Sequence, residues 1–162
     1  MVTGERWRPG LTVAGVIERE GHFLLVEEKT PEGIRFNQPA GHVDVGEAPA
    51  AAVVREVWEE TRYRFIPRAV VGAYLWQKPG SETAYLRFAY AGSVSDVPEP
   101  GELDAGILKV HWLTRDEIAA LAAAGKTRSP LVLAVIDDWL SGRRYSLDVV
   151  RLWREGEGLV VV

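Results

Sequence analysis

Short apolar runs alternate with polar breaks along most of the chain, a pattern typical of β-strands joined by turns. The runs predict strands over residues 12–17, 22–27, 69–77, 84–91 and 107–112. The polar triplet Arg19-Glu20-Gly21 predicts a hairpin turn between the first two strands, and residues 78–81 predict a turn between the third and fourth. The polar segment 29–35 and the acidic, Pro/Gly-rich segment 97–102 predict loops.

Two segments near the C-terminus carry the capping residues of helices. Thr114 and Glu117 have the spacing of a capping box, and Gly125 suits the far end of that helix. Ser129-Pro130 predicts an N-cap followed by proline at the first helical position, with the helix ending at Gly142. Strands in pairs, with helices between and after them, predict an α+β domain with a mixed sheet.

One domain accounts for most of the 162 residues, since no stretch is long and flexible enough to be a linker. We expect this domain to cover residues 1–142 and residues 143–162 to form a β-prone extension. The extension forms either a hairpin on the same domain or an arm that packs on a second subunit. Both a monomer and a homodimer therefore remain open.

Composition narrows the classes of function. With 19 Lys and Arg against 23 Asp and Glu, the net charge is −4, which gives no support to nucleic-acid binding. No apolar run reaches the roughly 18 residues of a membrane span, and no apolar signal segment is visible, so we expect a cytoplasmic protein without a membrane partner. Because Cys is absent and only three His are present, a metal site would have to be built from carboxylates.

The segment 49–61 places three carboxylates on one face of a predicted helix. Since successive helical residues advance by about 100°, Glu56, Glu59 and Glu60 share an arc about 100° wide. The apolar side chains on the opposite arc, which we expect to face the core, are Ala50, Val54, Val57 and Trp58. One interpretation is a solvated acidic face with Arg55 paired to Glu59 at i,i+4. The other is a hard divalent cation such as Mg²⁺, shared between carboxylates and substrate phosphates.

The spacing around these carboxylates resembles the Nudix box. That signature runs Gly, five residues, Glu, seven residues, then Arg-Glu-U-x-Glu-Glu-x-Gly-U, where U is a bulky aliphatic residue. Seven of its nine fixed positions are matched, by Gly41, Glu47, Arg55, Glu56, Val57, Glu59 and Glu60. Tyr63 fills the last position as an aromatic residue. Arg62 replaces the glycine that normally closes the helix with positive φ, at a cost of about 1 kcal/mol if the backbone is kept. We therefore expect the backbone of this turn to differ from that of the family, and we expect the chemistry to be the same because no metal ligand is changed.

Within the Nudix hydrolases the chain is similar to the NudJ phosphatase subfamily. The similarity rests on residues 36–42 (FNQPAGH), on Leu86-Arg87-Phe88 in a predicted strand and on residues 128–132 (RSPLV). It covers the chain from about Leu11 to about Leu140. The resemblance implies the Nudix fold, in which a mixed β-sheet is sandwiched between α-helices.

The resemblance also implies Mg²⁺-dependent hydrolysis of a phosphoanhydride, with Mn²⁺ as a substitute ion. Glu56, Glu59 and Glu60 would hold the metal, and Glu56 is a candidate to orient or deprotonate the attacking water. Members of the family also use a base from a loop outside the box. Glu102 and Asp104, in the acidic loop before the strand at 107–112, are our candidates for that base.

The remaining candidate residues support the site or bind substrate. Glu47 and Arg55 are implied to pair and fix the loop over the helix, and Gly41 allows a tight backbone turn there. The arginines that could contact substrate phosphates are Arg35, Arg87 and Arg128.

The implied substrates are nucleoside di- and triphosphates or a thiamine-precursor pyrimidine diphosphate. A second Nudix specificity, for ADP-ribose or a dinucleoside polyphosphate, is the alternative. A non-catalytic Nudix module that senses a nucleotide belongs to a different class, and so does a purely structural acidic domain. Since all three box carboxylates are present, the sequence favours an enzyme.

Overall fold

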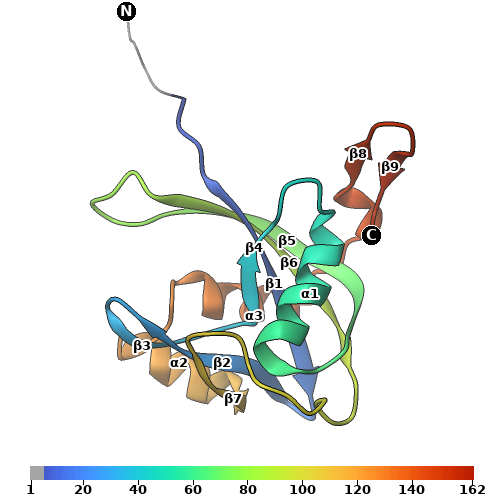
Figure 1. The fold of residues 1–162 in the computed structure, drawn as a ribbon. Coiled ribbons are helices and arrows are strands. Elements are labelled where there is room, and N and C mark those ends of the chain that lie inside the picture. The colour runs from blue at the N-terminus through green and yellow to red at the C-terminus, as the bar shows by residue number, and fades with distance from the viewer. Residues whose placement is uncertain (1–5) are drawn as a thin grey trace, which may run out of the picture.

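A mixed sheet of seven strands forms the centre of the molecule in the computed structural model, which describes residues 6–162 (Figure 1). The strands are β1 (Gly10–Arg19), β2 (His22–Thr30), β3 (Gly33–Asn37), β4 (Ala40–His42), β5 (Phe65–Gln77), β6 (Ala84–Val94) and β7 (Ile107–Thr114). They follow the order β3-β2-β1-β6-β5, while β4 pairs with β1 and β7 pairs with β2. Because β1 and β6 are parallel and the other pairs are antiparallel, the predicted mixed sheet is confirmed.

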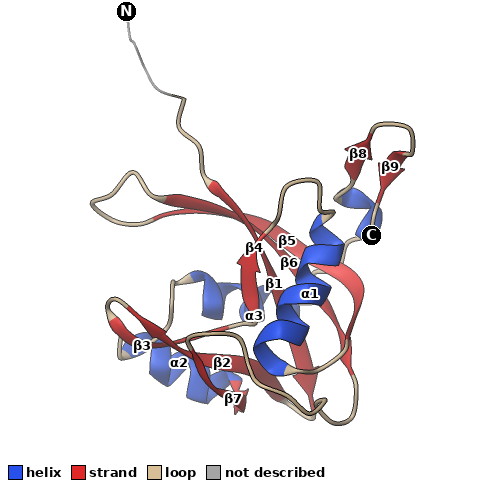
Figure 2. Cartoon of the chain, in the orientation of Figure 1, coloured by secondary structure: helices blue, strands red, loops and turns tan. Residues whose placement is uncertain are grey.

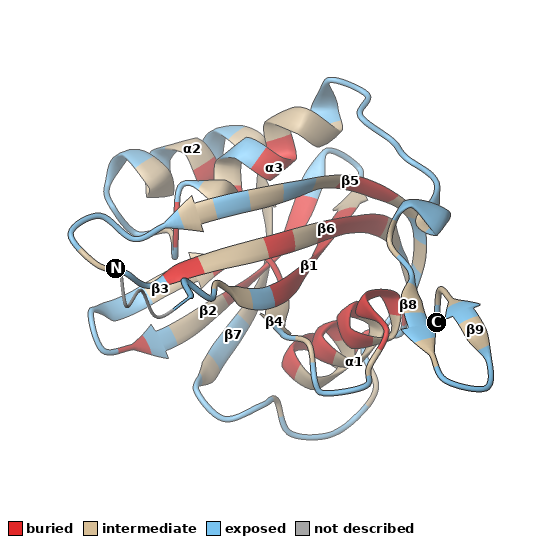
Figure 3. Ribbon diagram, turned by 90° about the horizontal axis from the view of Figure 1, so that it is seen from above, coloured by how far each residue is buried: buried red, intermediate tan, exposed pale blue. Residues whose placement is uncertain are grey.

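Helices cover the sheet on both faces (Figures 2 and 3). They are α1 (Pro49–Thr61), α2 (Arg115–Ala123) and α3 (Leu131–Leu140). α1 lies on one side of β1, β5 and β6, and α2 and α3 lie on the other, which confirms the predicted Nudix architecture. Within residues 6–162 no helix is long and apolar enough to cross a membrane.

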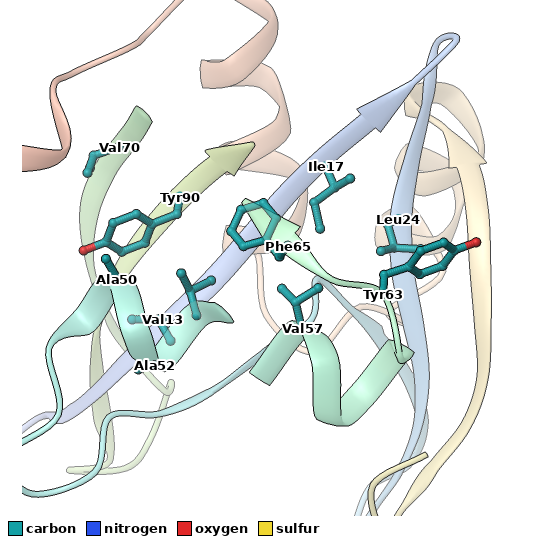
Figure 4. Packing of buried hydrophobic residues seen from close by; sticks show 11 residues of the cluster. Val13, Ile17, Leu24, Ala50, Ala52, Val57, Tyr63, Phe65, Val70 and Tyr90 are labelled. Carbon is teal, nitrogen blue, oxygen red and sulfur yellow. The ribbon is translucent and has the colours of Figure 1, made fainter. Parts of the chain in front are cut away.

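Strand alternation divides the core between the two faces. In β1, Val13 and Ile17 pack with Val57 of α1, whereas Val16 packs with Val132 and its neighbours from α3. Figure 4 shows the first of these clusters, with Tyr90 of β6 beside Val13. Each fully buried side chain of this kind contributes about 1.5–3 kcal/mol to folding. The core therefore fixes the position of α1 against the sheet, and the acidic face of the helix points away from this core.

The prediction of a loop over residues 29–35 is wrong. β2 continues to Thr30 and β3 begins at Gly33, so the two strands form a hairpin in which Glu28 lies opposite Arg35. Pro31 sits in the short turn, where the missing N–H of proline costs nothing. The Thr30 hydroxyl donates to the Gly33 carbonyl at 2.7 Å and closes that turn. The predicted hairpin turn at Glu20-Gly21 is confirmed, with φ of 51° and 79°.

The predicted caps differ in detail between the two C-terminal helices. The Thr114 side chain accepts from the Glu117 N–H, and the Glu117 side chain accepts from the Thr114 N–H, so the capping box is confirmed. α3 begins one residue later than expected, at Leu131. Pro130 has helical angles but is the N-cap of the helix and not its first residue. The Ser129 hydroxyl still accepts from the Leu131 N–H, at 3.2 Å.

The last twenty residues return to the domain. Tyr145 bridges to Val70 at the outer strand β5, and the following turn is a 3-10 helix at Leu147–Val149 in place of the β-prone run expected there. β8 (Leu152–Arg154) and β9 (Gly158–Val160) then form a small hairpin. Apolar residues of this segment pack against the core on the α1 side; they are Leu147, Val150 and Val161.

Arg62 ends α1 in the left-handed conformation, with φ 63° and ψ 6°. Its N–H donates to the Trp58 carbonyl at 2.8 Å, which is the contact that a C-terminal glycine usually makes. The expected departure in this turn is therefore absent. The Arg62 guanidinium lies 4.0 Å from the centre of the Trp58 ring, and this cation–π contact offsets the strain of the backbone by about 0.5–1 kcal/mol.

We predict that Arg62→Gly leaves the free energy of unfolding within about 0.5 kcal/mol of the native value, because relief of strain offsets the lost stacking. Arg62→Ala keeps the strain and loses the stacking, so it should be less stable than Arg62→Gly by about 1 kcal/mol. Urea denaturation of the three proteins measures this order. An alanine variant as stable as the glycine variant would show that the backbone is unstrained at this position.

Candidate active site

The acidic face of α1 lies directly against β4. Gly41 of β4 faces Glu56 so closely that a Cβ built on Gly41 would overlap the Glu56 carboxylate. β4 is itself held to β1, where Gly41 pairs with Val13. The absence of a side chain at Gly41 is thus what allows the carboxylate to reach the strand, a more specific role than the flexible turn that the sequence indicated.

Glu60 is the most deeply placed carboxylate of the box and is 7% exposed. It accepts a hydrogen bond from the Ala40 N–H at 3.0 Å. Burial raises the pKa of Glu60 to about 9, and the neighbouring Glu56 carboxylate acts in the same direction. Burial also raises the pKa of Glu56, against the hydrogen bond from Arg55. Two carboxyl groups are therefore held out of water next to each other, which is unfavourable without a cation.

Arg55 connects the loop before α1 to the acidic face. Its Nε and Nη2 donate to the two Glu47 oxygens, both at 2.8 Å, in a bidentate pair. Its Nη1 donates to Glu56 at 2.7 Å and to Glu59 at 3.3 Å, and Nη2 also donates to the His42 carbonyl at 3.0 Å. Hydrogen bonds from Arg55 lower the pKa of Glu47. This geometry supports the role of loop anchor suggested for Glu47 and Arg55, and it contains the i,i+4 pair of Arg55 with Glu59 as well.

The chemistry of these donors fits a hard divalent cation. Glu56, Glu59 and Glu60 present only carboxylate oxygens, and two of the three are buried where a positive charge would offset the desolvation of both. Within the described part of the chain, no three acidic or imidazole groups converge closely enough to enclose an ion. Glu56 and Glu59 instead share Arg55, so binding of a cation would require these side chains to turn from the guanidinium.

The two candidate bases differ in their relation to this face. The Asp104 N–H donates to the Glu59 carbonyl at 2.9 Å, which fixes its loop against the end of α1. The Asp104 charge also raises the pKa of both Glu56 and Glu60, so its carboxylate lies near them. Glu102 is exposed. The Trp58 Nε1–H donates a hydrogen bond to the Glu99 Oε2 at 2.8 Å, on another part of α1.

A pocket of about 320 Å³ opens beside the acidic face and meets it at Ala40 and Gly41. Its walls come from β1 to β6 and from the segment before α3. The polar and charged residues that line it are Thr12, Glu28, Glu32, Arg35, Asn37, His42, Lys78, Arg87, Arg128 and Ser129. The three arginines that the sequence suggested are therefore brought together in one cavity, next to the carboxylates.

Arg87 is the buried arginine of this pocket. Its Nη1 is 3.5 Å from the Asn37 Oδ1, and its Nε has no hydrogen-bond partner among the described residues. Burial lowers the pKa of Arg87 to about 10. Arg35 and Arg128 lie closer to the opening, where Arg35 donates to the Ile34 carbonyl and the Arg128 Nε lies 3.6 Å from the Glu28 carboxylate. A buried guanidinium with unused donors is suited to a phosphate.

Several pocket residues were not predicted from the sequence, among them Glu28, Glu32 and Lys78. Glu28 and Asn37 lie on the hairpin whose turn was predicted as part of a longer loop, and of the two only Asn37 belongs to a string that carried the family resemblance, residues 36–42. Glu32 and Lys78 belong to two different hairpins and form an ion pair of 2.7 Å at the pocket. No pattern in the sequence distinguishes Glu28, because it lies in the charged run from Glu27 to Lys29, which is typical of a solvated strand end.

Comparisons with known proteins agree with this geometry. A model of the NUDIX domain family matches residues 7–134. The phosphatase NudJ of Escherichia coli strain K12 is 35% identical over 144 residues, which cover 89% of this chain and 92% of that protein. The solved structure of a NUDIX hydrolase from Nitrosomonas europaea is 42% identical and has a TM-score of 0.84, over 93% of this chain and 100% of that one.

A more distant structure supports the fold alone. The MutT NUDIX hydrolase from Burkholderia pseudomallei is 22% identical, with a TM-score of 0.62 over 81% of this chain and 95% of that one. The resemblance inferred from the box and from the strings around it is thereby confirmed. The chain belongs to the NUDIX domain family, and it is a Nudix phosphohydrolase.

Proposed function

We propose that this enzyme uses Mg²⁺ to hydrolyse phosphoanhydride bonds in nucleoside di- or triphosphates or in a thiamine-precursor pyrimidine diphosphate. The observation that carries the proposal is the junction at Gly41, where a pocket containing a buried arginine meets a buried acidic helix face. A phosphorylated small molecule is the ligand class that needs both features at once.

Each group in the site has a definite task in this scheme. Glu56, Glu59 and Glu60 would hold Mg²⁺ or Mn²⁺, which supplies charge stabilisation to the phosphoryl oxygens. Arg87 donates to a phosphate oxygen from the pocket side and so orients the anhydride against the acidic face. Arg55 and Glu47 hold the loop and the helix in register. The pocket walls keep water away from the organic part of the substrate.

We assign the removal of the proton from the attacking water to Asp104 in preference to Glu102. The Asp104 N–H donates to the Glu59 carbonyl of α1, and the Asp104 charge raises the pKa of Glu60, whereas Glu102 makes no backbone hydrogen bond to α1 among the described residues. A base must lie within reach of the water that attacks phosphorus. Glu56 is the remaining candidate, because it also faces the junction.

The size of the pocket bears on the alternatives. A volume of about 320 Å³ lies at the lower end of the range for ligand pockets, about 300–1,000 Å³. It fits one nucleoside or one heterocycle better than the two nucleosides of a dinucleoside polyphosphate. A non-catalytic sensor would have no need for two buried carboxylates, Glu56 and Glu60, held at the cost of desolvation.

A substrate panel tests the proposal. Nucleoside di- and triphosphates, ADP-ribose, a dinucleoside polyphosphate and a pyrimidine diphosphate are each incubated with Mg²⁺, and the products are identified by chromatography. We expect cleavage at an anhydride that stops when a chelator is added. Tight nucleotide binding without turnover of any compound would instead indicate a sensor, and absence of saturable Mg²⁺ binding would indicate a structural acidic domain.

Glu56→Gln and Glu60→Gln should each lower kcat by at least about 10²-fold, because charge stabilisation of the transition state is lost. Circular dichroism should show that both variants remain folded. Asp116→Asn on α2 is a matched control, since its side chain is 97% exposed and far from α1 in sequence. Full activity in either glutamine variant would contradict the assignment of the ligands.

Glu60→Gln should stabilise the protein when no metal is added. A carboxyl group whose pKa rises on folding from its ordinary value to about 9 destabilises the fold progressively as pH rises between those values. At pH 8 we expect the variant to be more stable than the native protein by at least about 1 kcal/mol. The difference should vanish near about pH 4, where both states are protonated. Thermal unfolding should also lose the rise in Tm that Mg²⁺ gives the native protein.

Alanine at Asp104 and alanine at Glu102 should have different effects. We expect Asp104→Ala to lower kcat by about 10²-fold, as is typical for a lost general base, and Glu102→Ala to lower it by less than about threefold. Steady-state kinetics with the best substrate of the panel, at several pH values, measures both. If neither substitution affects kcat, the base is Glu56.

A further inference from the structure

Glu28 has a carboxylate in the pocket that the protein itself does not satisfy. It extends from β2 opposite Arg35 and lines the cavity. Its Oε1 is shielded from solvent and accepts no hydrogen bond from any described residue. The Arg128 Nε, at 3.6 Å, is too far for a hydrogen bond. Burial raises the pKa of Glu28, and the charges of Arg128 and Arg87 oppose that rise and favour the ionised carboxylate. A shielded carboxylate oxygen of this kind is costly unless a donor reaches it.

The other walls of the pocket indicate what would bring that donor. Trp76 and Tyr85 are stacked, with ring centres 6.2 Å apart and planes 13° apart, and both are only partly buried. Such a pair offers a flat surface on which a ring of the ligand can stack. A ring that lies there beside Glu28 can present a group from its edge.

Arg87 fixes the direction in which the ligand lies. The Arg87 Nη1 lies 3.5 Å from the Oδ1 of Asn37, on the hairpin that carries Glu28, and the pocket that Arg87 lines reaches the acidic face at Gly41. The phosphates would occupy the side of Arg87 that meets the acidic face. The ring of the same ligand is then on the side of Glu28, and its edge meets the Glu28 side chain, which is 19% exposed.

We infer that Glu28 is a specificity-determining residue, which accepts a hydrogen bond from an amino group on the ring of the substrate and so selects amino-bearing over oxo-bearing heterocycles. The inference rests on the proposed hydrolysis of nucleotide-like diphosphates. An ionised carboxylate accepts hydrogen bonds and donates none, so an oxo group at the same ring position would face it lone pair to lone pair. Asn37 cannot make this selection, because its amide both donates and accepts.

Pairs of nucleotides that differ only in this group give a direct test. CTP and UTP share sugar and phosphates and differ at one ring position, as do ATP and ITP. For the native enzyme we expect kcat/KM for the amino member of the pair that it accepts better to exceed that of the oxo member by at least about tenfold. Glu28→Gln should bring the ratio close to about one, because the amide can donate to an oxo group.

Glu27→Gln is the matched control. Glu27 is the neighbour of Glu28 in β2 and does not line the pocket, since its carboxylate pairs with His111 at 2.7 Å. This substitution should leave the amino-to-oxo ratio at the native value. If Glu28→Gln fails to fold by circular dichroism, Glu28→Asp retains the charge but withdraws it from the ring, and should lower the ratio as well.

Several outcomes would overturn the inference and are distinguishable from a failure of the proposed function. An unchanged ratio in Glu28→Gln, or an equal loss of kcat with all four nucleotides, would mean that Glu28 serves structure or the reaction centre. If the native enzyme cleaves none of them, the proposed function fails for nucleotides. Calorimetric titration with CDP and UDP then makes the same comparison through binding, and equal affinities for the native protein would reject the role of Glu28.

Discussion

The contact between a glycine in β4 and the carboxylates of α1 is the constraint on which the site depends. Glu56 and Glu60 can lie against a backbone strand only because Gly41 has no side chain and the Ala40 N–H is free to donate. This arrangement opposes folding, since both carboxyl groups leave water. The apolar face of the same helix offsets that cost, because Val53 and Val57 are fully buried against the sheet. One helix thus carries buried apolar side chains that stabilise the fold and buried carboxylates that oppose it.

The sheet brings the rest of the site to this helix. Thr12 of β1 and Arg87 of β6 are partners in the parallel register, and both line the pocket. Glu28 reaches it from the neighbouring hairpin. The cavity therefore combines residues from Thr12 to Leu131, and strand pairing places most of them together. Burial removes water from the Arg87 guanidinium and from the Glu28 carboxylate. The two groups therefore favour a ligand that brings a negative charge to one and a hydrogen-bond donor to the other.

The acidic helix could be predicted from the sequence because its carboxylates lie close together in the chain. Helical spacing puts Glu56, Glu59 and Glu60 on one arc, and the positions of Gly41 and Glu47 follow from the spacing of the box. The capping box at Thr114 is local in the same way. The pocket could not be predicted, because the parallel pairing of β1 with β6 joins distant segments and produces no periodic pattern in the sequence of either strand. The hairpin at Glu28 was missed because Pro31 and Gly33 are as typical of a loop as of a two-residue turn. Arg62 shows a third limit, since a stacking partner one turn earlier made an unfavourable backbone angle tolerable.

The return of the C-terminal segment to the sheet changes how much of the sheet edge is available to other molecules. β5 is the outermost strand of the sheet order, and such a strand can extend its ladder with a strand from another molecule. The bridge between Val70 and Tyr145 occupies part of that margin with the chain's own backbone. The backbone hydrogen bonds between these two residues leave less of the β5 edge open to a strand from a second molecule.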